Sequence, residues 1–359
     1  LLIVMCLFIF IPYRKLSPMI AFIDVGQGDA TLIKCDGHSM LIDAGNNDKG
    51  TLVQNYLQHQ GVETLDYVIG THPDADHIGG MDVVLYKFDC KTIIMPDVAN
   101  NTRTYDDVVQ TMKNKGYKTT YPVVGETYTI GGAAFTIIAP NKEYGNDMNS
   151  WSVGVLLQNG NHRFLFTGDA EEGAEQDILQ NGIDISADVY KVAHHGSNTA
   201  TSQAFLDAVH PTYAVISAGE GNSYGHPHAE VLNRLRAAGV SVFRTDEQGT
   251  IVATSDGTTL TWNMSPSESW QAGEAEKSQN TEKSEKAADS QNNAETDAAV
   301  SNPTDQTDGN SDVIVHITKT GEKYHSAGCQ YLRKSDIEVT LSEAKARGLT
   351  PCSKCNPPQ

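Results

Sequence analysis

The stretch that most constrains this chain is THPDADHIGG, residues 71–80, which directly follows the apolar run LDYVIG. It places histidines and aspartates at positions i, i+2, i+4 and i+5. Imidazole nitrogens and carboxylate oxygens bind divalent metal ions, and close spacing lets one loop supply several ligands. The alternative is a polar loop whose aspartates cap the helix predicted at IGGMDVVLYKF. The spacing favours a metal-binding loop after a buried strand.

Further residues of the ligand type follow other predicted strands. RFLFTGDAEEG places Asp169 at a strand end, where its carboxylate can bridge two ions. VYKVAHHGSNTA places His194 and His195 at another strand end, and SYGHPHAE places His226 and His228 just before a predicted helix. The turn around His226 presents its ring outward, whereas His228 is interpreted as a polar residue at a helix start. These segments strengthen the prediction of a metal site.

The organisation of the chain favours one large domain and one small one. Residues 20–263 alternate short strands with helices, which indicates an α/β class of fold in which helices cover sheets. Residues 265–312 are polar and acidic with a single aromatic residue, Trp270, and are predicted to be a disordered linker. Regular patterning resumes in residues 313–359, which are predicted to form a small second domain.

The first segment, residues 1–16, contains the apolar run LLIVMCLFIFIPY. The run is shorter than the roughly 20 residues that span a bilayer. We interpret it as the core of a signal peptide or the remnant of a membrane anchor, with a buried strand as the alternative. This interpretation predicts a bacterial protein that is extracellular or anchored at the cell surface.

The order of the motifs resembles the metallo-β-lactamase superfamily. H-x-D-x-D-H-x-G-G is followed by N-x-x-S-V, T-G-D, H-H-G-S and G-H-P-H. FIDVGQGDATLI and then LIDAG further resemble the C-terminal domain of ComEC-type competence proteins and their free-standing relatives. The resemblance covers residues 20–263 and implies a four-layer αββα sandwich with a two-metal site at one rim of its sheets.

The resemblance also implies a set of metal ligands. In this set one carboxylate bridges two ions, and each ion has further ligands of its own. The ligands are His72 and Asp74 at the first ion, Asp76, His77 and His194 at the second, and Asp169 between them. His194 is preferred to His195 because it follows the predicted strand directly, and His195 would then contact the substrate.

Two departures from the commoner superfamily pattern bear on the metal. Asp74 stands where H-x-H-x-D-H has its second histidine, and no histidine occupies the mid-chain ligand position, where Asn149 is the nearest candidate. Oxygen ligands favour Mn²⁺ or Mg²⁺ more than nitrogen and sulfur ligands do. Two manganese or zinc ions are therefore expected.

Other residues near these motifs receive roles in turnover. Asp76 is expected to orient the attacking water, His226 to act as general acid, and His195 to be the next candidate for the acid. The DVGQGD segment, residues 24–29, is interpreted as the first hairpin turn. The predicted substrate contacts are Asn149, Ser152 and Ser197.

The C-terminal segment contains H-x₃-C-x₂₂-C-x₂-C, formed by His325, Cys329, Cys352 and Cys355. Two close ligand pairs separated by a longer insert are typical of a structural tetrahedral zinc site. A disulfide between the last two cysteines is the alternative. The segment resembles the metal-binding domain of Ada-type DNA-repair proteins, although His325 replaces a cysteine, which puts methyl-transfer chemistry in doubt.

These features lead to three functional hypotheses. The first is an extracellular metal-dependent phosphodiesterase, in particular a nuclease, that works as a monomer and docks to nucleic acid or the cell surface through its C-terminal domain. The second is a hydrolase of a small phosphodiester, such as a cell-wall phosphocholine ester, and the third is a DNA-uptake accessory without catalysis. The formal net charge of -19 counts against a polyanionic partner.

Overall fold

The computed structural model divides the chain into two compact units, Leu1–Thr281 and Glu282–Gln359. The predicted segment 1–16, and residues 274–312 of the predicted linker, lie outside the residues that the structure describes. The described residues are 18–273, 314–318, 323–325, 332, 337–346, 349–352 and 354–355.

The first sheet of the larger unit has the strand order β15-β14-β1-β2-β3-β4-β5-β6. β1, β2 and β3 pair antiparallel, whereas β3, β4, β5 and β6 pair parallel. The strands are β1 (Met19–Phe22), β2 (Thr31–Cys35), β3 (His38–Ile42), β4 (Thr64–Ile69), β5 (Asp89–Ile94), β6 (Thr119–Thr120), β14 (Ile251–Ser255) and β15 (Leu260–Trp262).

The second sheet has the order β13-β12-β11-β10-β9-β8-β7, with parallel pairing from β10 to β13 and antiparallel pairing from β7 to β10. Its strands are β7 (Thr127–Ile130), β8 (Ala133–Ala139), β9 (Gly154–Asn159), β10 (His162–Phe166), β11 (Val189–Lys191), β12 (Tyr213–Ile216) and β13 (Ser241–Arg244).

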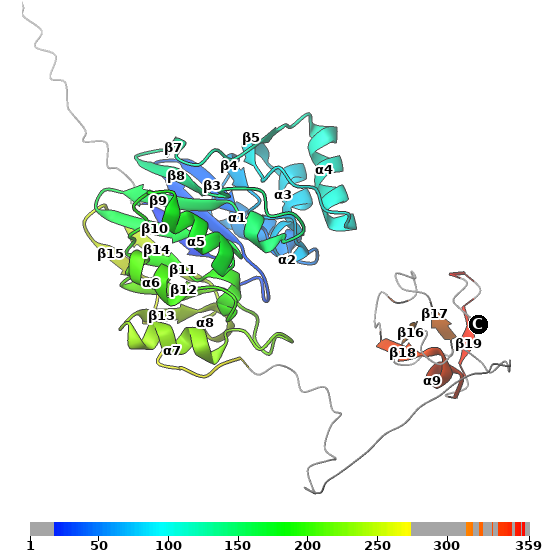
Figure 1. Ribbon diagram of the computed structural model, residues 1–359. Coiled ribbons are helices and arrows are strands. Elements are labelled where there is room, and N and C mark those ends of the chain that lie inside the picture. Colours follow the sequence, from blue (N-terminus) through cyan, green and yellow to red (C-terminus); the bar gives the residue numbers. More distant parts are fainter. Residues whose placement is uncertain are drawn as a thin grey trace, which may run out of the picture. The chain divides into compact units, whose positions relative to one another are not determined.

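Helices cover the outer face of each sheet (Figure 1). α1, α3 and α4 pack on the first sheet through Val53, Val84 and Val108, among others, and α5, α6 and α7 pack on the second. The helices are α1 (Gly50–His59), α2 (Ala75–Ile78), α3 (Met81–Lys87), α4 (Arg103–Lys115), α5 (Glu172–Gln180), α6 (Gln203–Val209), α7 (Ala229–Ala237) and α8 (Thr245–Gln248), with 3-10 turns η1 (Asn149–Trp151) and η2 (Ala193–Gly196).

A third apolar layer lies between the two sheets. It contains side chains such as Phe22 and Ile69 from the first sheet and Phe164 and Val215 from the second. Strand alternation explains the layering, because neighbouring residues of a strand face opposite sides and both sides of each sheet are covered. The αββα sandwich expected from the motif order is confirmed.

Residues 265–273 belong to the larger unit, although the linker was predicted to begin at residue 265. Ser267 N donates to Val242 O at 2.7 Å, and Gly273 N donates to Pro227 O at 3.0 Å. Trp270 packs against the apolar cluster beneath the outer helices. A single aromatic anchor and backbone hydrogen bonds hold this segment, and neither produces a periodic sequence pattern. We call residues 265–273 the strap.

The smaller unit has a four-stranded sheet of order β18-β16-β17-β19. Its core includes Val315, Ile317, Tyr324, Val339 and Leu341. The elements are β16 (Ile314–Ile317), β17 (Lys323–His325), β18 (Ile337–Thr340), α9 (Leu341–Ala346) and β19 (Thr350–Pro351).

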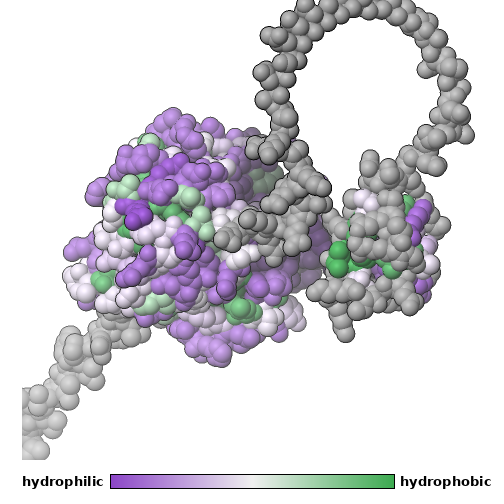
Figure 2. Space-filling view, turned by 90° about the horizontal axis from the view of Figure 1, so that it is seen from below, coloured by the Kyte–Doolittle hydropathy of each residue, from purple (hydrophilic) through white to green (hydrophobic). Residues whose placement is uncertain are grey.

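One face of the larger unit is mostly polar. Figure 2 shows this face, on which hydrophilic residues dominate and hydrophobic residues appear only in small groups. Across the described parts of the chain, every helix is too short or too polar to cross a membrane.

Candidate metal centre

The loop after β4 delivers the residues of the first motif. His72 lies in the loop and His77 in the short helix α2, and both side chains are fully buried. Asp74 occupies the position before α2, but its side chain makes no capping hydrogen bond. The alternative interpretation, that aspartates of this loop cap the helix predicted at IGGMDVVLYKF, does not hold, because Gly80 occupies the N-cap position of the corresponding helix α3.

Asp43, which follows β3, fixes the orientation of His77. Its Oδ2 lies 2.8 Å from His77 Nδ1, and its Oδ1 accepts a hydrogen bond from the backbone N–H of Thr71 at 2.8 Å. A carboxylate behind Nδ1 places the proton there and leaves Nε2 free as a ligand. Asp43 was not among the residues predicted for the site, although it lies in the LIDAG segment that carries the resemblance.

Ser152 supports the centre from behind. Its Oγ lies 3.3 Å from His72 Nδ1 and accepts a hydrogen bond from Asp169 N at 3.0 Å. The side chain is fully buried, so a substrate cannot reach it. The prediction that Ser152 contacts the substrate is therefore wrong, and the residue holds two ligand-type residues in place instead.

Asp169, which follows β10, lies between the two halves of the centre. Its Oδ1 is 3.2 Å from His77 Nε2, and its Oδ2 is 3.4 Å from His195 Nε2. Asp76 Oδ2 is 3.3 Å from the same nitrogen of His195. Asp169 thus lies between His77 and His195, and its role as a bridge between two ions stays a prediction.

His195, rather than His194, points into the centre. His195 is 1% exposed, and its Nδ1 donates to Ser217 O at 3.0 Å, which leaves Nε2 facing Asp169 and Asp76. His194 is 20% exposed, and its Nε2 lies farther from Asp169 Oδ2, at 3.7 Å. The geometry therefore favours His195 as the ligand, the reverse of the predicted order.

The residues of the centre fit divalent cations. Among the described residues, four buried atoms here lack a hydrogen-bond partner: His72 Nε2, His77 Nε2, His195 Nε2 and Asp169 Oδ1. Ligand atoms of His72, His77 and Asp169 lie within 4.8 Å of one another, as do those of Asp76, His77 and His195. Buried polar atoms without partners are costly, and a cation would satisfy them. The mixed nitrogen and oxygen set suits zinc or manganese.

The protonation of the centre follows from its carboxylates. Burial alone would lower the pKa of His77, but Asp169 and Asp43 outweigh it and raise that pKa well above its usual value. Burial likewise opposes the rise in the pKa of His195, which Asp169 causes. Burial would raise the pKa of Asp76, yet the hydrogen bond from His195 and the charge of His77 lower it to about 2. Without a metal, protons bound to histidines balance these carboxylates.

The remaining predicted residues lie around the centre. Asp74 Oδ2 is 3.8 Å from His72 Nε2, its side chain is 39% exposed, and it belongs to none of the close ligand groups. Asn149 Nδ2 donates to Glu171 Oε1 at 3.2 Å, and this oxygen lies 3.4 Å from His194 Nδ1. Glu171, which no sequence motif indicated, thus links the predicted substrate contact Asn149 to His194.

Ser197 and His226 lie on the loops that follow β11 and β12. Ser197 Oγ lies 3.1 Å from Thr199 Oγ1. His226 Nδ1 lies 3.4 Å from Gln27 Nε2, an amide donor, which places the ring proton on Nε2. Burial, together with the charges of His195 and His194, lowers the pKa of His226 to about 3. An imidazole with this pKa is neutral at pH 7 in the metal-free protein and can donate a hydrogen bond from Nε2; its role as the general acid stays a prediction.

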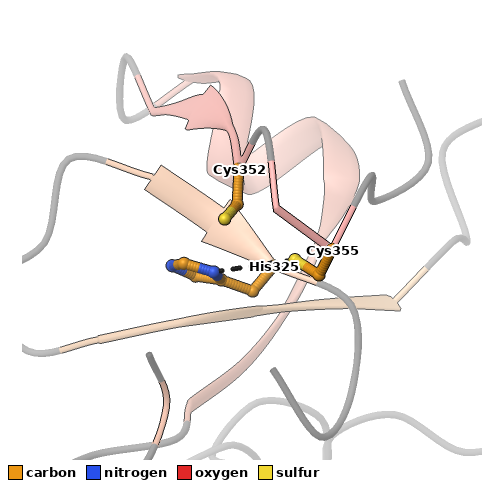
Figure 3. Close-up of side chains that lie close together, drawn as sticks. All are labelled: His325, Cys352 and Cys355. Carbon is orange, nitrogen blue, oxygen red and sulfur yellow. Dashed lines mark hydrogen bonds between the residues drawn. The ribbon is translucent and has the colours of Figure 1, made fainter. Parts of the chain in front are cut away.

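The smaller unit brings together part of a second ligand set. Figure 3 shows the side chains of His325, Cys352 and Cys355 turned toward one another. Their ligand atoms lie within 4.8 Å of one another, and His325 Nδ1 is 3.8 Å from Cys355 Sγ. Cys329, the fourth predicted ligand, lies outside the described residues.

Comparison with known proteins agrees with this geometry. The family model of the metallo-beta-lactamase superfamily matches residues 23–220. ComE operon protein 3 of Bacillus subtilis is 30% identical over 69% of this chain and 34% of its own length. Recombination protein 2 of Haemophilus influenzae is 32% identical over 69% of this chain and 31% of its own length. Competence protein ComA of Neisseria gonorrhoeae is 29% identical over 64% of this chain and 31% of its own length.

The matched region thus spans about a third of each of these relatives. The family match covers more than half of the chain and includes the loops that carry His72, His77, Asp169 and His195. The chain therefore belongs to the metallo-beta-lactamase superfamily, which has a hydrolase fold, and within it to the ComEC-type competence proteins.

Proposed function

We propose that the larger unit is a metal-dependent phosphodiesterase, and in particular a nuclease acting outside the cell. The observation that carries the proposal is the convergence of buried, unpartnered ligand atoms from His72, His77, His195 and Asp169 at one rim. Two divalent ions bound there would activate a water molecule and stabilise the charge of a phosphodiester. The family fold hosts several reactions, so the substrate must come from experiment.

The residues of the centre would have different roles in this reaction. His72, Asp169 and, from a greater distance, Asp74 would hold one ion, whereas Asp76, His77 and His195 would hold the other, with Asp169 shared. Asp76 would be the partly exposed ligand, with 29% of its side chain exposed, and would orient the attacking water. His226 would donate a hydrogen bond from Nε2 to the substrate. These roles follow the distances in the centre.

A second candidate is the hydrolysis of a small phosphodiester with a cationic group, such as a phosphocholine ester. The net charge of -19 favours this substrate over a polyanion. A cavity of about 480 Å³ lies beside Gln27. It is lined by Asp24, Glu220 and Asp246, whose carboxylates add to the negative charge near the centre. Bound divalent ions would offset part of this charge, which keeps the nuclease as the first proposal.

The wider setting belongs to the same proposal. We place the protein outside the cell or at its surface, as a monomer, and the mostly hydrophilic face in Figure 2 is compatible with a monomer. The smaller unit would bind structural zinc through His325, Cys329, Cys352 and Cys355 and would dock to nucleic acid or the cell surface.

Hydrolysis assays on the full chain test the proposal. Single-stranded DNA, duplex DNA, RNA, bis-p-nitrophenyl phosphate and p-nitrophenyl phosphocholine are each offered with Mn²⁺, Mg²⁺ and Zn²⁺. We expect metal-dependent cleavage that Asp169→Asn abolishes and that Asp97→Asn, at an exposed position, leaves unchanged. If no substrate is cleaved with any metal while DNA is still bound, the chain is a binding accessory instead.

A further inference from the structure

Lys191 is a buried cation that the chemistry described above does not use. Its side chain is 3% exposed, and its Nζ lies 2.8 Å from Asp29 Oδ2 and donates to Val192 O at 2.9 Å. Lys191 ends β11 two residues after Val189, whose side chain lies in the layer between the sheets. Alternation along the strand puts Lys191 on the same face, so the pair joins the two sheets beneath the centre.

The other oxygen of Asp29 faces a metal ligand. Asp29 Oδ1 lies 3.4 Å from His195 Nδ1, the nitrogen that donates to Ser217 O. Asp29 therefore lies behind His195, on the side where Asp43 lies behind His77. The two carboxylates differ in two respects. Asp43 Oδ2 is 2.8 Å from His77 Nδ1, whereas Asp29 Oδ1 makes no hydrogen bond and faces His195 as a charge. Within the described residues, Asp29 also has an ion pair with Lys191, whereas Asp43 has an ion pair with His77 alone.

The backbone around Asp29 is fixed to the ligand loop. Asp29 N donates to Asp76 O at 3.1 Å, and Asp29 O accepts from Gly45 N at 2.8 Å. Gly28 has φ +139°, and a Cβ at this position would overlap the carbonyl oxygen of Asp76. The segment 24–29 is thus more than a hairpin turn, because it sets where the carboxylate of Asp29 can lie.

We propose that Asp29 is a positioning residue for His195, and through it for the ion that Asp76 and His77 would also hold, and that Lys191 neutralises the buried charge of Asp29. Asp29 orients the ring of His195, and Lys191 holds Asp29 and cancels its charge. The proposal rests on the metal chemistry proposed for the centre, but not on the identity of its substrate. Carboxylates behind histidine ligands typically change metal affinity by roughly 10- to 100-fold.

The proposal predicts different effects for the two halves of the pair. Asp29→Asn removes the orienting carboxylate and leaves a buried positive charge near a cation site, so we expect binding of one Mn²⁺ to weaken by roughly 10- to 100-fold. Lys191→Met leaves a negative charge there and is expected to bind Mn²⁺ at least as tightly as the original chain. The double variant is expected to bind more weakly than the original chain and more tightly than Asp29→Asn.

The test is a Mn²⁺ titration of the full chain by calorimetry, with Co²⁺ absorption as a second readout of the ligand geometry. All titrations are done at a temperature where circular dichroism shows each variant folded. The matched control is the pair Lys91 and Asp66, 2.7 Å apart at a site away from the centre, changed to methionine and asparagine. We expect the control to leave Mn²⁺ affinity unchanged.

Equal Mn²⁺ affinity in folded Asp29→Asn and the original chain would overturn the proposal, as would equal weakening by Asp29→Asn and Lys191→Met. If Asp29→Asn does not fold, the neutral double variant decides, because an affinity equal to that of the original chain leaves no positioning role. If the original chain hydrolyses no phosphodiester, the proposed function is refuted, but this titration still tests the positioning role.

Discussion

At the residue scale, the backbone explains why His195 rather than His194 reaches the centre. His194 and His195 have φ of 48° and 52°, and Gly196 continues at 84°. Left-handed conformations at non-glycine residues cost about 1–3 kcal/mol each and persist where surrounding structure holds them. This turn folds the chain back after β11 and directs the second histidine, rather than the first, toward Asp169.

We predict that His195→Ala and His194→Ala differ in metal binding, because His195 would be a ligand and His194 only lies beside the centre. His195→Ala should remove a ligand and weaken the binding of one ion by more than the roughly 10- to 100-fold that is typical when a residue supporting a ligand is replaced. His194→Ala should retain both ions. Metal content by mass spectrometry and Mn²⁺ affinity by calorimetry measure the difference. The opposite ranking of the two variants would restore the assignment based on strand position.

Metal binding should depend on pH through the same histidines. The pKa of His77 and of His195 is raised in the metal-free protein, so both hold protons above their usual pKa of 6.5. A histidine with a raised pKa stabilises the fold below pH 6.5, and this stabilisation is lost as pH rises through the higher folded value. The metal-free protein should therefore lose stability as pH rises from 6.5, whereas metal affinity should increase because fewer protons are displaced.

Melting temperatures with chelator and with Mn²⁺ across pH 6 to 9 measure this effect, together with calorimetry in buffers of different ionisation enthalpy. A melting temperature of the chelated protein that does not change over this range would contradict the raised pKa values. Asp76 and Asp169 do not interfere, because their pKa is lowered and both stay ionised throughout.

At the element scale, the strap shows what periodicity cannot reveal. Arg244 Nη1 donates to Gln271 O at 2.6 Å, and the guanidinium of Arg236 lies 5.7 Å from the ring centre of Trp270. A Cβ at Gly273 would overlap the carbonyl oxygen of His226, so the end of the strap lies directly against the turn that carries this histidine. The composition of residues 265–273 gives no sign of these contacts.

We predict that the strap is needed for full stability and rate. Chains that stop after residue 264 and after residue 273 both lack the smaller unit and differ only in the strap. The free energy of unfolding of the shorter chain should be lower by about 0.5–3 kcal/mol, since this chain loses the packing of Trp270. It should also hydrolyse bis-p-nitrophenyl phosphate more slowly. Urea unfolding and initial rates measure both effects. Identical curves for the two chains would show that the strap contributes nothing.

At the scale of the whole molecule, the fold could be predicted because the motifs occur in the order that is typical of the metallo-β-lactamase superfamily. The sequence could not predict pairs that form only when the sheets pack. Asp29 and Lys191 are far apart in the chain and meet across the two sheets. Ser152 was predicted to contact the substrate because it stands beside a predicted buried strand. Its side chain is itself buried, which no local pattern encodes, and it contacts His72 and the backbone of Asp169 instead.

The two units should also differ in how they depend on metal. The larger unit has extensive apolar layers, whereas the smaller has a short core around Tyr324 and a cluster of His325, Cys352 and Cys355. A domain of this size has too little core to fold without further support, and bound zinc would provide it. We predict that the full chain binds one zinc ion in the smaller unit and that the double variant Cys352→Ser/Cys355→Ser loses it.

In this double variant, hydrogen exchange of residues 314–317 and 337–340 should rise to that of an unfolded chain, while the melting temperature of the larger unit stays the same. Cys35→Ala, in a buried strand of the larger unit, is the control and should keep the zinc. Native mass spectrometry counts the metal. Because a disulfide between Cys352 and Cys355 would also support so small a core, finding that bond with no zinc bound would contradict the zinc site and establish the alternative predicted from the sequence.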